Sequence, residues 1–333
     1  MRARILGTGS FVPERVVTNA DLAQWIDTSD EWIRERTGIR ERRWVAEGSG
    51  VGSAELGTEA ARRALAESGV APDAIELVIF ATLSPNHDFP GNGVLLQRSM
   101  GLTSAATLDI RQQCTGFVHG LSIADAYLRA GVYRHVLVVA AEVQSPGLDL
   151  SNRGRDMAVI FADGAGAAVV GAVPDDDARG ILAVRVHSDG EHAEDLWCEA
   201  PSVRNWPEVP PSVREAGRHY PRMHGRVVFR HAVQRMPEVV HEVLRAGGHT
   251  LDELTLLVPH QANLRILEHV QKTLELPDDK VAVNLDRYGN TTAASIPLAF
   301  DECRRSGRLS DGDLVCLVAF GAGFTWGAAL LRL

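Results

Sequence analysis

A repeated segment constrains the fold of this chain more than any other feature of its sequence. Residues 59–79 align with residues 238–258 over twenty-one positions without a gap. Each copy predicts an amphipathic helix that stops at a glycine, then a short turn with an aspartate, then a buried strand. The matched pairs are Glu59 with Glu238, Leu65 with Leu244, Gly69 with Gly248, Asp73 with Asp252, Ile75 with Leu254, and Leu77 with Leu256.

A second similarity links a later part of each half. The glycine- and alanine-rich segments 163–170 and 321–330 each come after an apolar, strand-like run. Helix–glycine–strand units recur in many α/β proteins, but the matched glycine and aspartate favour a true duplication. We therefore predict two α/β halves, each with a largely buried sheet and crossover helices. The predicted parts are a first half at 1–175, a connecting segment at 176–222 and a second half at 223–333.

The connecting segment contains a proline-rich stretch, 198–222, that has no helical or strand period. Two tryptophans, Trp197 and Trp206, lie at its start, and they predict that it packs down as a lid over the body of the protein. A loop of this length in a compact protein is usually functional.

Composition excludes several classes of protein. The net charge of −9 argues against a general nucleic-acid binder. No apolar run approaches the roughly 18 residues that span a bilayer, and the first residues lack the apolar region of a signal peptide. Scattered cysteines without a C-x-x-C pair predict reduced thiols in a cytoplasm and no metal site. These cysteines are Cys114, Cys198, Cys303 and Cys316.

Cys114 lies between an apolar, strand-like run at 105–110 and a helical pattern at 117–128. A thiol at a helix start faces unpaired backbone N–H groups and the positive end of the helix dipole. We therefore expect the pKa of Cys114 to be lowered, as in nucleophilic cysteines. The alternative is a small buried hydrophobic residue, which is what most free cysteines are.

Two polar residues of the second half complete a chemical set with this thiol. His260 follows a predicted strand of the repeat, where ligands gather in α/β folds, and Asn290 follows a glycine at a sharp turn. Considered alone, His260 is as readily a buried core histidine, and Asn290 is as readily a turn residue. Together, a thiolate can accept an acyl group, and the histidine and asparagine can donate to one oxyanion. The loop 321–323 can bring a backbone N–H beside the thiol as a second oxyanion hole.

With these residues placed, the chain closely resembles the β-ketoacyl-acyl carrier protein synthase III family of the thiolase superfamily. The resemblance covers nearly the full length. Its motifs stand at 5–13, 28–39, 114–117, 163–167, 260–263, 288–291 and 321–327.

The resemblance implies a five-layered αβαβα fold, an obligate homodimer and a ping-pong Claisen condensation without a cofactor or metal. Cys114 would take an acyl group from acyl-CoA, and malonyl-acyl carrier protein would then bind and lose carbon dioxide. His260 and Asn290 would hold the malonyl carbonyl as it becomes enolate-like. The backbone N–H groups of Cys114 and Ala322 would hold the thioester oxyanion, although the family usually has glycine at position 322.

Further residues carry over from the family to binding roles. Trp32, Arg36, Arg153 and Asn263 would line the CoA tunnel, where an indole stacks on adenine and guanidinium groups pair with phosphate. Phe89 would reach across the dimer to bound the partner's acyl pocket. The candidates for docking acidic carrier protein are Arg230, Arg265 and Lys272, which are equally well explained as a solvated surface.

The sequence departs from the family pattern at two places beside the substrate entrance. Residues 152–157 are about two residues longer, and residues 198–222 about ten longer, than the family's short form. The starter acyl group therefore stays open. Two other functions on the same fold also stay open: transfer of the acyl group to a hydroxyl or amine in secondary metabolism, and the joining of two long acyl chains. The paired His260 and Asn290 favour decarboxylative condensation.

Overall fold

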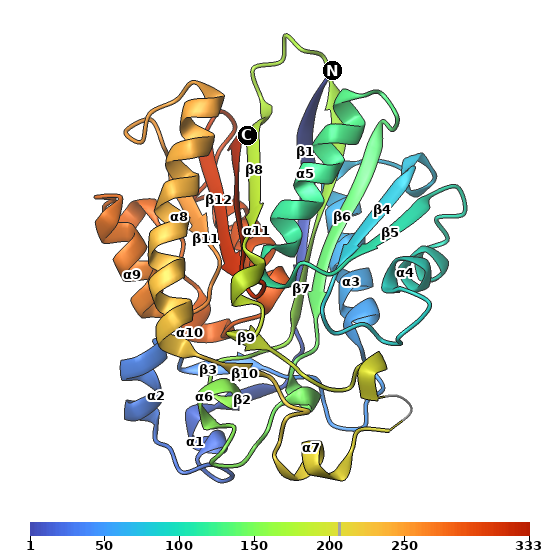
Figure 1. Ribbon diagram of the computed structural model, residues 1–333. Helices are drawn as coiled ribbons and strands as arrows, with labels where there is room; N and C mark the ends of the chain where they lie inside the picture. The colour runs from blue at the N-terminus through green and yellow to red at the C-terminus, as the bar shows by residue number, and fades with distance from the viewer. Residues whose placement is uncertain (206–207) are drawn as a thin grey trace.

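The computed structural model describes residues 1–205 and 208–333, so Trp206 lies outside the described residues. Two sheets stand side by side, with helices between them and on both outer faces (Figure 1). The first sheet has the order β1 (Arg2–Phe11), β7 (Gly164–Val173), β6 (His135–Glu142), β4 (Leu77–Ala81) and β5 (Ala106–Ile110). The second has the order β11 (Leu256–Pro259), β12 (Leu314–Gly321), β13 (Thr325–Arg332) and β8 (Gly180–Ser188).

The strands of the two sheets pair in a similar order of parallel and antiparallel neighbours. In the first sheet β4 is parallel to β5 and β6, and β7 is antiparallel to β6 and β1. In the second, β11 is parallel to β12, and β13 is antiparallel to β12 and β8. Parallel strands need a crossover connection, and helices supply it here.

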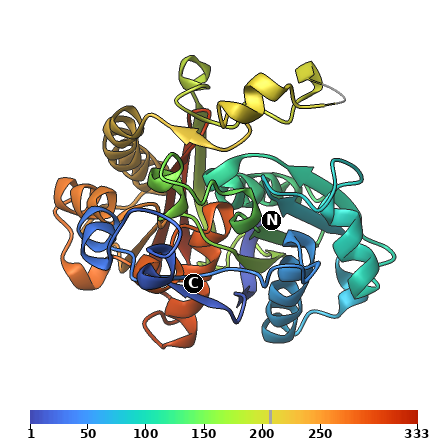
Figure 2. The ribbon, with the colours of Figure 1, turned by 90° about the horizontal axis from the view of Figure 1, so that it is seen from below.

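Three apolar layers of side chains hold the helices to the sheets. Helix α5 (Gly116–Arg129) and helix α11 (Ser295–Arg305) lie between the two sheets and share one core with both. Helix α3 (Ser53–Ser68) covers the outer face of the first sheet with α4 (Asn92–Met100) beside it, and α8 (Gly225–Gly247) covers that of the second. Figures 1 and 2 show this order of layers, which is the αβαβα fold that the sequence predicted.

The repeat folds as its pattern predicts. In the first copy α3 ends at Gly69, which has a φ of 66°, and β4 follows. In the second copy α8 ends at Gly248, with a φ of 75°, and β11 follows. Both glycines take the left-handed conformation that favours glycine at the end of a helix. The helix–glycine–strand prediction is confirmed in both copies.

The segment between the predicted halves is more than a connection. Its residues 180–188 form β8, which pairs with β13 along its whole length. We therefore propose that the second half begins near Gly180, and that residues 189–224 are an excursion from it. This excursion holds β9 (Leu196–Trp197), α7 (Pro211–Glu215) and β10 (Arg222–Met223).

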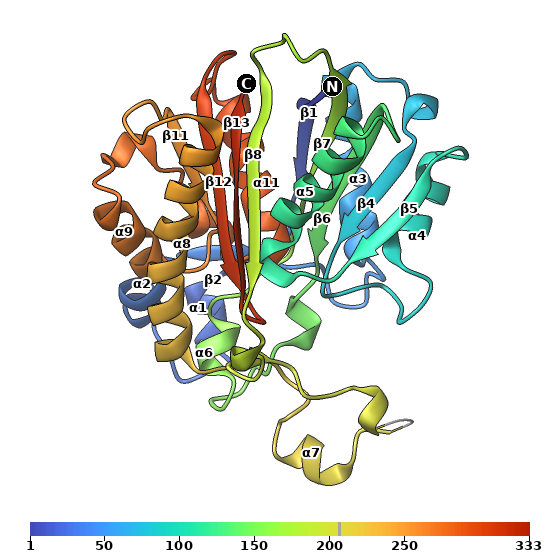
Figure 3. The ribbon, with the colours of Figure 1, turned by 45° about the horizontal axis from the view of Figure 1, so that its top comes forward.

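The excursion differs from the lid that the tryptophans predicted. Strands β9 and β10 pair at its base, but the part around α7 projects from the body (Figure 3). Val203, in this projecting part, is 90% exposed. Leu196 and Met223, at the base, pack on apolar neighbours.

Smaller elements surround the base of the two sheets. A ribbon of β2 (Val16–Thr18) and β3 (Glu41–Arg43) lies with α1 and α2 in a separate apolar cluster. In the described part of the chain, no helix has the length and apolar character needed to cross a membrane. The remaining helices are α1 (Asn19–Leu22), α2 (Asp30–Thr37), α6 (Arg155–Ala158), α9 (Leu264–Thr273) and α10 (Leu285–Tyr288).

Candidate active site

Cys114 lies in a 3-10 turn, Gln113–Thr115, that leads directly into α5 between the two sheets. Its side chain is 6% exposed. The end of β12 passes so close that a Cβ placed on Gly321 would lie 2.8 Å from the Cys114 Cβ and 3.1 Å from its backbone nitrogen. Only glycine allows this approach, which brings the following backbone N–H, that of Ala322, to the thiol.

The pKa of Cys114 is shifted in the direction opposite to the sequence prediction. Burial, together with the nearby Glu142 carboxyl, raises the pKa of the thiol to about 12, while the backbone N–H groups of Cys114 and Ala322 act in the lowering direction. The helix start is therefore present, but removal of the thiolate from water outweighs it. The thiol is therefore protonated at neutral pH.

The backbone around Ala322 fits the role expected of it. Ala322 is not among the described non-glycine residues with positive φ, so alanine causes no strain there. Its carbonyl accepts a hydrogen bond from Thr325 Oγ1 at 3.1 Å, and Thr325 Oγ1 lies 2.9 Å from Thr115 Oγ1. This chain of contacts ties the loop after β12 to the turn that carries Cys114.

His260 directly follows β11, and its backbone N–H donates to the Val318 carbonyl at 2.7 Å. The imidazole is 2% exposed. Burial lowers the pKa of His260 to about 3, because the charged ring would lose its hydration. The ring is therefore neutral at pH 7. Its Nδ1 is buried and has no hydrogen-bond partner among the described residues.

Asn290 is oriented by its own loop. Gly289, with a φ of 64°, turns the chain so that the backbone of Asn290 pairs with the Ile160–Ala162 strand-like segment. The Asn290 Oδ1 accepts a hydrogen bond from the Thr292 N–H at 2.8 Å. Since that bond fixes which end of the amide is the acceptor, the Nδ2 group is left to donate toward the cavity.

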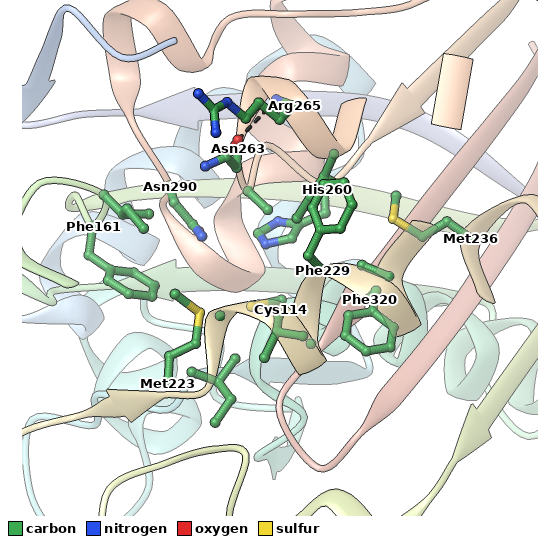
Figure 4. A pocket seen from close by; sticks show the side chains of 18 of the residues that line it. Cys114, Phe161, Met223, Phe229, Met236, His260, Asn263, Arg265, Asn290 and Phe320 are labelled. Carbon is green, nitrogen blue, oxygen red and sulfur yellow. Dashed lines mark hydrogen bonds between the residues drawn. The ribbon is translucent and has the colours of Figure 1, made fainter. Parts of the chain in front are cut away.

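Cys114, His260 and Asn290 come from three separate segments and line one cavity of about 240 Å³ (Figure 4). Arg36, Asn263 and Arg265 line the same cavity. A second cavity, of about 360 Å³, also reaches Cys114 and is lined by Ala322. Phe161 and Leu196 line both cavities. The thiol thus has access to two spaces, as a group that receives an acyl chain from a carrier requires.

The expected CoA residues divide into two groups. Trp32, on α2, has the Arg36 guanidinium 4.3 Å and the Arg155 guanidinium 4.6 Å from its ring centroid. Arg153 is elsewhere: its Nε donates to Asp149 Oδ2 at 2.6 Å and its Nη1 to the Glu215 carbonyl at 3.2 Å. Arg155, in place of Arg153, therefore lies against the tryptophan.

Asn263 and Arg265 have structural contacts at the rim of the first cavity. The Asn263 side chain caps α9 through the Arg265 N–H at 2.9 Å, and its Nδ2 donates to the Arg36 carbonyl at 2.9 Å. The Arg265 guanidinium donates twice to the Glu35 carbonyl. Both residues therefore join α9 to α2 beside the cavity.

The remaining predicted binding residues lie on the surface. Arg230, on α8, and Lys272, on α9, are exposed. Phe89 is 86% exposed in the loop between β4 and α4, a large apolar side chain open to water. The described residues contain no group of three or more His, Cys, Asp or Glu side chains that could hold a metal ion.

Two residues beside the site were missed from the sequence. Arg155 could have been found by giving weight to the length of the 152–157 loop. Glu142 ends the apolar strand β6 and is fully buried, with hydrogen bonds from Thr82, Ser84 and the Leu83 N–H. A lone acid after a run of apolar residues was the signal. Burial raises the pKa of Glu142 to about 7, against these hydrogen bonds.

Comparison with known proteins agrees with this geometry. Residues 108–190 match the family model 3-oxoacyl-[acyl-carrier-protein] synthase III, and residues 244–333 match its C-terminal model. The chain is 45% identical over 331 residues to the β-ketoacyl-[acyl-carrier-protein] synthase III of Rhizorhabdus wittichii, covering 99% of both chains. The crystal structure of the Aquifex aeolicus 3-oxoacyl-[acyl-carrier-protein] synthase III superposes with a TM-score of 0.90 at 40% identity, covering 99% of this chain and 100% of the other.

The Thermus thermophilus synthase III structure gives the same TM-score, 0.90, at 41% identity, with 99% of each chain covered. The fold and these matches first define a class: a condensing enzyme of the thiolase fold, which is a transferase of acyl groups. Within that class, the chain belongs to the β-ketoacyl-acyl carrier protein synthase III family.

Proposed function

We propose that this enzyme primes Cys114 from acyl-CoA and then condenses the acyl group with malonyl-acyl carrier protein, releasing carbon dioxide and 3-oxoacyl-acyl carrier protein. The observation that carries the proposal is the meeting of Cys114, His260 and Asn290 at one cavity beside the Ala322 N–H. A thiol, two side-chain donors and an N–H pair are the parts that a decarboxylative condensation needs.

In the first half-reaction the Cys114 sulfur attacks the thioester carbonyl of acyl-CoA. The oxyanion forms against the N–H groups of Cys114 and Ala322. When it collapses, the bond to the CoA sulfur breaks, CoA leaves as a thiol with the proton that Cys114 lost, and the acyl group stays on Cys114. The neutral His260 can carry that proton between the two sulfurs.

In the second half-reaction the malonyl thioester takes the place of CoA in the first cavity. His260 and Asn290 donate hydrogen bonds to its carbonyl oxygen as the carboxylate leaves as carbon dioxide and the electron pair forms an enolate. The enolate carbon attacks the Cys114 thioester, a carbon–carbon bond forms, and the Cys114 sulfur leaves as a thiolate. The thiolate then takes up one proton from solvent, which the net condensation consumes. Hydrogen bonds that strengthen as charge develops lower the barrier.

The nucleotide end of CoA would lie at Trp32. We propose Arg155 and Arg36 for this grip, in place of the Arg153 that the family pattern suggested, because both guanidinium groups face the indole. An indole and two guanidinium groups suit an adenine with its phosphates. Asn263 would support CoA binding indirectly, because its side chain joins α9 to α2 at the rim of the first cavity.

The partners follow from the same reaction. The acyl donor and acceptor are acyl-CoA and an acyl carrier protein, no further cofactor takes part, and the reaction belongs to fatty-acid synthesis in the cytoplasm. We propose Arg230, Arg265 and Lys272 at the carrier-protein surface, with Arg265 contributing mainly through α2. The exposed Phe89 and the free edge of strand β5 are what a homodimer would cover.

Intact mass spectrometry tests the first half-reaction. Incubation with acyl-CoA should add one acyl group to the wild-type protein and none to Cys114→Ala. If the wild-type mass is unchanged with acyl-CoAs of every length, the proposed mechanism is wrong.

Asn290→Ala tests the division of roles. Release of carbon dioxide from malonyl-carrier should fall by about a hundredfold, the usual cost of one oxyanion donor, while acylation of Cys114 continues. An equal loss in both half-reactions would show that Asn290 does not serve the enolate. Transfer to a hydroxyl or amine forms no enolate, so it would not need Asn290 as an enolate donor, although it could still use His260 to move a proton.

A further inference from the structure

The 152–157 loop and residues 215–220 contact one another beside the second cavity. Arg153, from the 152–157 loop, donates to the Glu215 carbonyl at the end of α7, and its guanidinium lies 5.9 Å from the Tyr220 ring centroid. Gly217 packs directly on the same guanidinium, in a left-handed conformation with a φ of 66°. A Cβ on residue 217 would lie 2.4 Å from the Arg153 guanidinium, so the guanidinium would have to move to accept a side chain there.

Arg153 is itself held firmly for a half-exposed arginine. Its Nε donates to Asp149 Oδ2, whose Oδ1 accepts from Ser151 Oγ at 2.7 Å. Burial acts to raise the pKa of Asp149, but these two hydrogen bonds outweigh it and hold the pKa below its usual value. The charged pair fixes the guanidinium, and the guanidinium fixes residues 215–220.

From this anchor the chain runs directly to the wall of the second cavity. Arg222 pairs with Trp197 across the β9–β10 ribbon. Glu199 binds both Arg218, at 2.8 Å, and Arg222, at 3.0 Å. Hydrogen bonds therefore connect Arg153 to residue 215, Glu199 to Arg218 and Arg222, and the β10 strand to Trp197.

Trp197 stands between the second cavity and an outer one. The second cavity, which reaches Cys114, is lined by Trp197, Met157 and Pro221. The same three residues line an outer cavity of about 420 Å³ that also touches Arg153. The indole is the largest of the three, so it is the main barrier between the two spaces.

We propose that Trp197 is the residue that limits the acyl chain carried on Cys114, and that Arg153 is the positioning residue that holds it there. This inference rests on the proposed priming of Cys114 by acyl-CoA. The CoA arm occupies the first cavity, so the acyl chain extends into the second. At roughly 30 Å³ for each non-hydrogen atom, about the share of a water in the liquid, a 360 Å³ cavity takes about a dozen atoms.

The substrate class that follows is a medium-length acyl-CoA, of roughly eight to ten carbons once space beside polar walls is left unfilled. Gln113, Gln144 and Arg111 supply those polar walls. A longer chain would meet the indole of Trp197 and could pass only if residues 215–222 moved.

The test measures the rate of Cys114 acylation in the intact enzyme for a series of acyl-CoAs from acetyl to hexadecanoyl. Wild type should be fastest near eight to ten carbons. Trp197→Ala joins the two cavities, and its rate with hexadecanoyl-CoA relative to octanoyl-CoA should rise about tenfold or more, the scale of size discrimination in apolar pockets. Trp197→Phe should keep most of the wild-type profile.

Two variants break the anchor at residues that do not line the second cavity. Arg153→Ala removes the guanidinium, and Gly217→Ala pushes against it without changing any charge. Both variants should raise the acylation rate with long acyl chains relative to shorter ones, as Trp197→Ala does. Gly48→Ala is the matched control, because Gly48 has a similar φ of 70° with open space around it, and it should leave the profile unchanged. Arg155→Ala should lower the rates for all chain lengths by one common factor.

The outcomes separate this inference from the proposed function. If Trp197→Ala keeps the wild-type profile, or if Arg153→Ala gives only the uniform loss expected of Arg155→Ala, the inference is wrong. If wild type accepts acetyl-CoA alone, the medium-chain assignment is wrong while the priming of Cys114 stands. If no acyl group of any length reaches Cys114, the proposed function itself fails.

Discussion

Replacing Gly321 by alanine should disable the site without removing any reactive group. The new methyl carbon would lie 2.8 Å from the Cys114 Cβ, 3.1 Å from its nitrogen and 3.3 Å from its sulfur. Carbon atoms in contact normally lie about 3.5–4.0 Å apart, so the two backbones must separate by about 0.7–1.2 Å. A displacement of about 1 Å at a reacting group costs about a hundredfold in rate. The same movement takes the Ala322 N–H away from the thioester oxygen.

The assay is single-turnover acylation of Cys114, followed by intact mass, with thermal melting measured in parallel. Gly321→Ala should fold, lose a few degrees in melting temperature and acylate about a hundredfold more slowly. The control is Gly147→Ala, since a Cβ on Gly147 meets nothing within 4 Å, and it should match wild type in both measurements. An acylation rate within threefold of wild type in Gly321→Ala would refute the argument that the close approach of β12 builds the oxyanion hole.

Two buried groups give pH-dependent predictions with opposite signs. Burial raises the pKa of Glu142 to about 7, so the native state holds a proton that the unfolded chain loses above its ordinary value of 4.5, and stability falls as pH rises from there through about 7. Glu142→Gln should remove that fall, measured by denaturant unfolding at about pH 5 and about pH 8. Its Cys114 should also react with iodoacetamide at lower pH, because a charge that raises the pKa of the thiol is gone; an unchanged alkylation profile would contradict this. Burial lowers the pKa of His260 to about 3, so stability is lost as pH falls below about 6.5. His260→Gln should reduce this loss of unfolding free energy by about 2 kcal/mol at about pH 5. If the variant loses as much unfolding free energy in acid as wild type does, the buried ring is not held neutral.

The fold was largely predictable because its signals are local. Gly69 and Gly248 end their helices in the left-handed conformation, and each is followed at a fixed distance by an apolar strand. Those features depend on a few neighbouring residues, so the pattern of the sequence contains them. The expectation that Cys114, His260 and Asn290 act together came from their chemistry and their family motifs, and the structure places all three at one cavity.

What the sequence could not give depends on residues far apart in the chain. The pKa of Cys114 was predicted in the wrong direction because the helix start is local, whereas burial comes from the packing of β12, α5 and Glu142 around the thiol. The choice between Arg153 and Arg155 depends on which guanidinium lies against Trp32, a long-range contact that motif spacing does not resolve. The path of residues 198–222 has no period to predict it, and it depends on contacts with distant residues such as Arg153.

The two reactive groups are both uncharged at neutral pH, and this limits how the first step can proceed. Burial raises the pKa of Cys114 to about 12 and lowers the pKa of His260 to about 3, so the neutral thiol and neutral imidazole are favoured over a thiolate–imidazolium pair. The pair is therefore not a resting state, and the proton must move while acyl-CoA is bound and charge passes to the oxyanion. His260 Nδ1 has no hydrogen-bond partner among the described residues, so no neighbour fixes the tautomer. The same ring can then take a proton in priming and donate a hydrogen bond to the malonyl carbonyl in condensation.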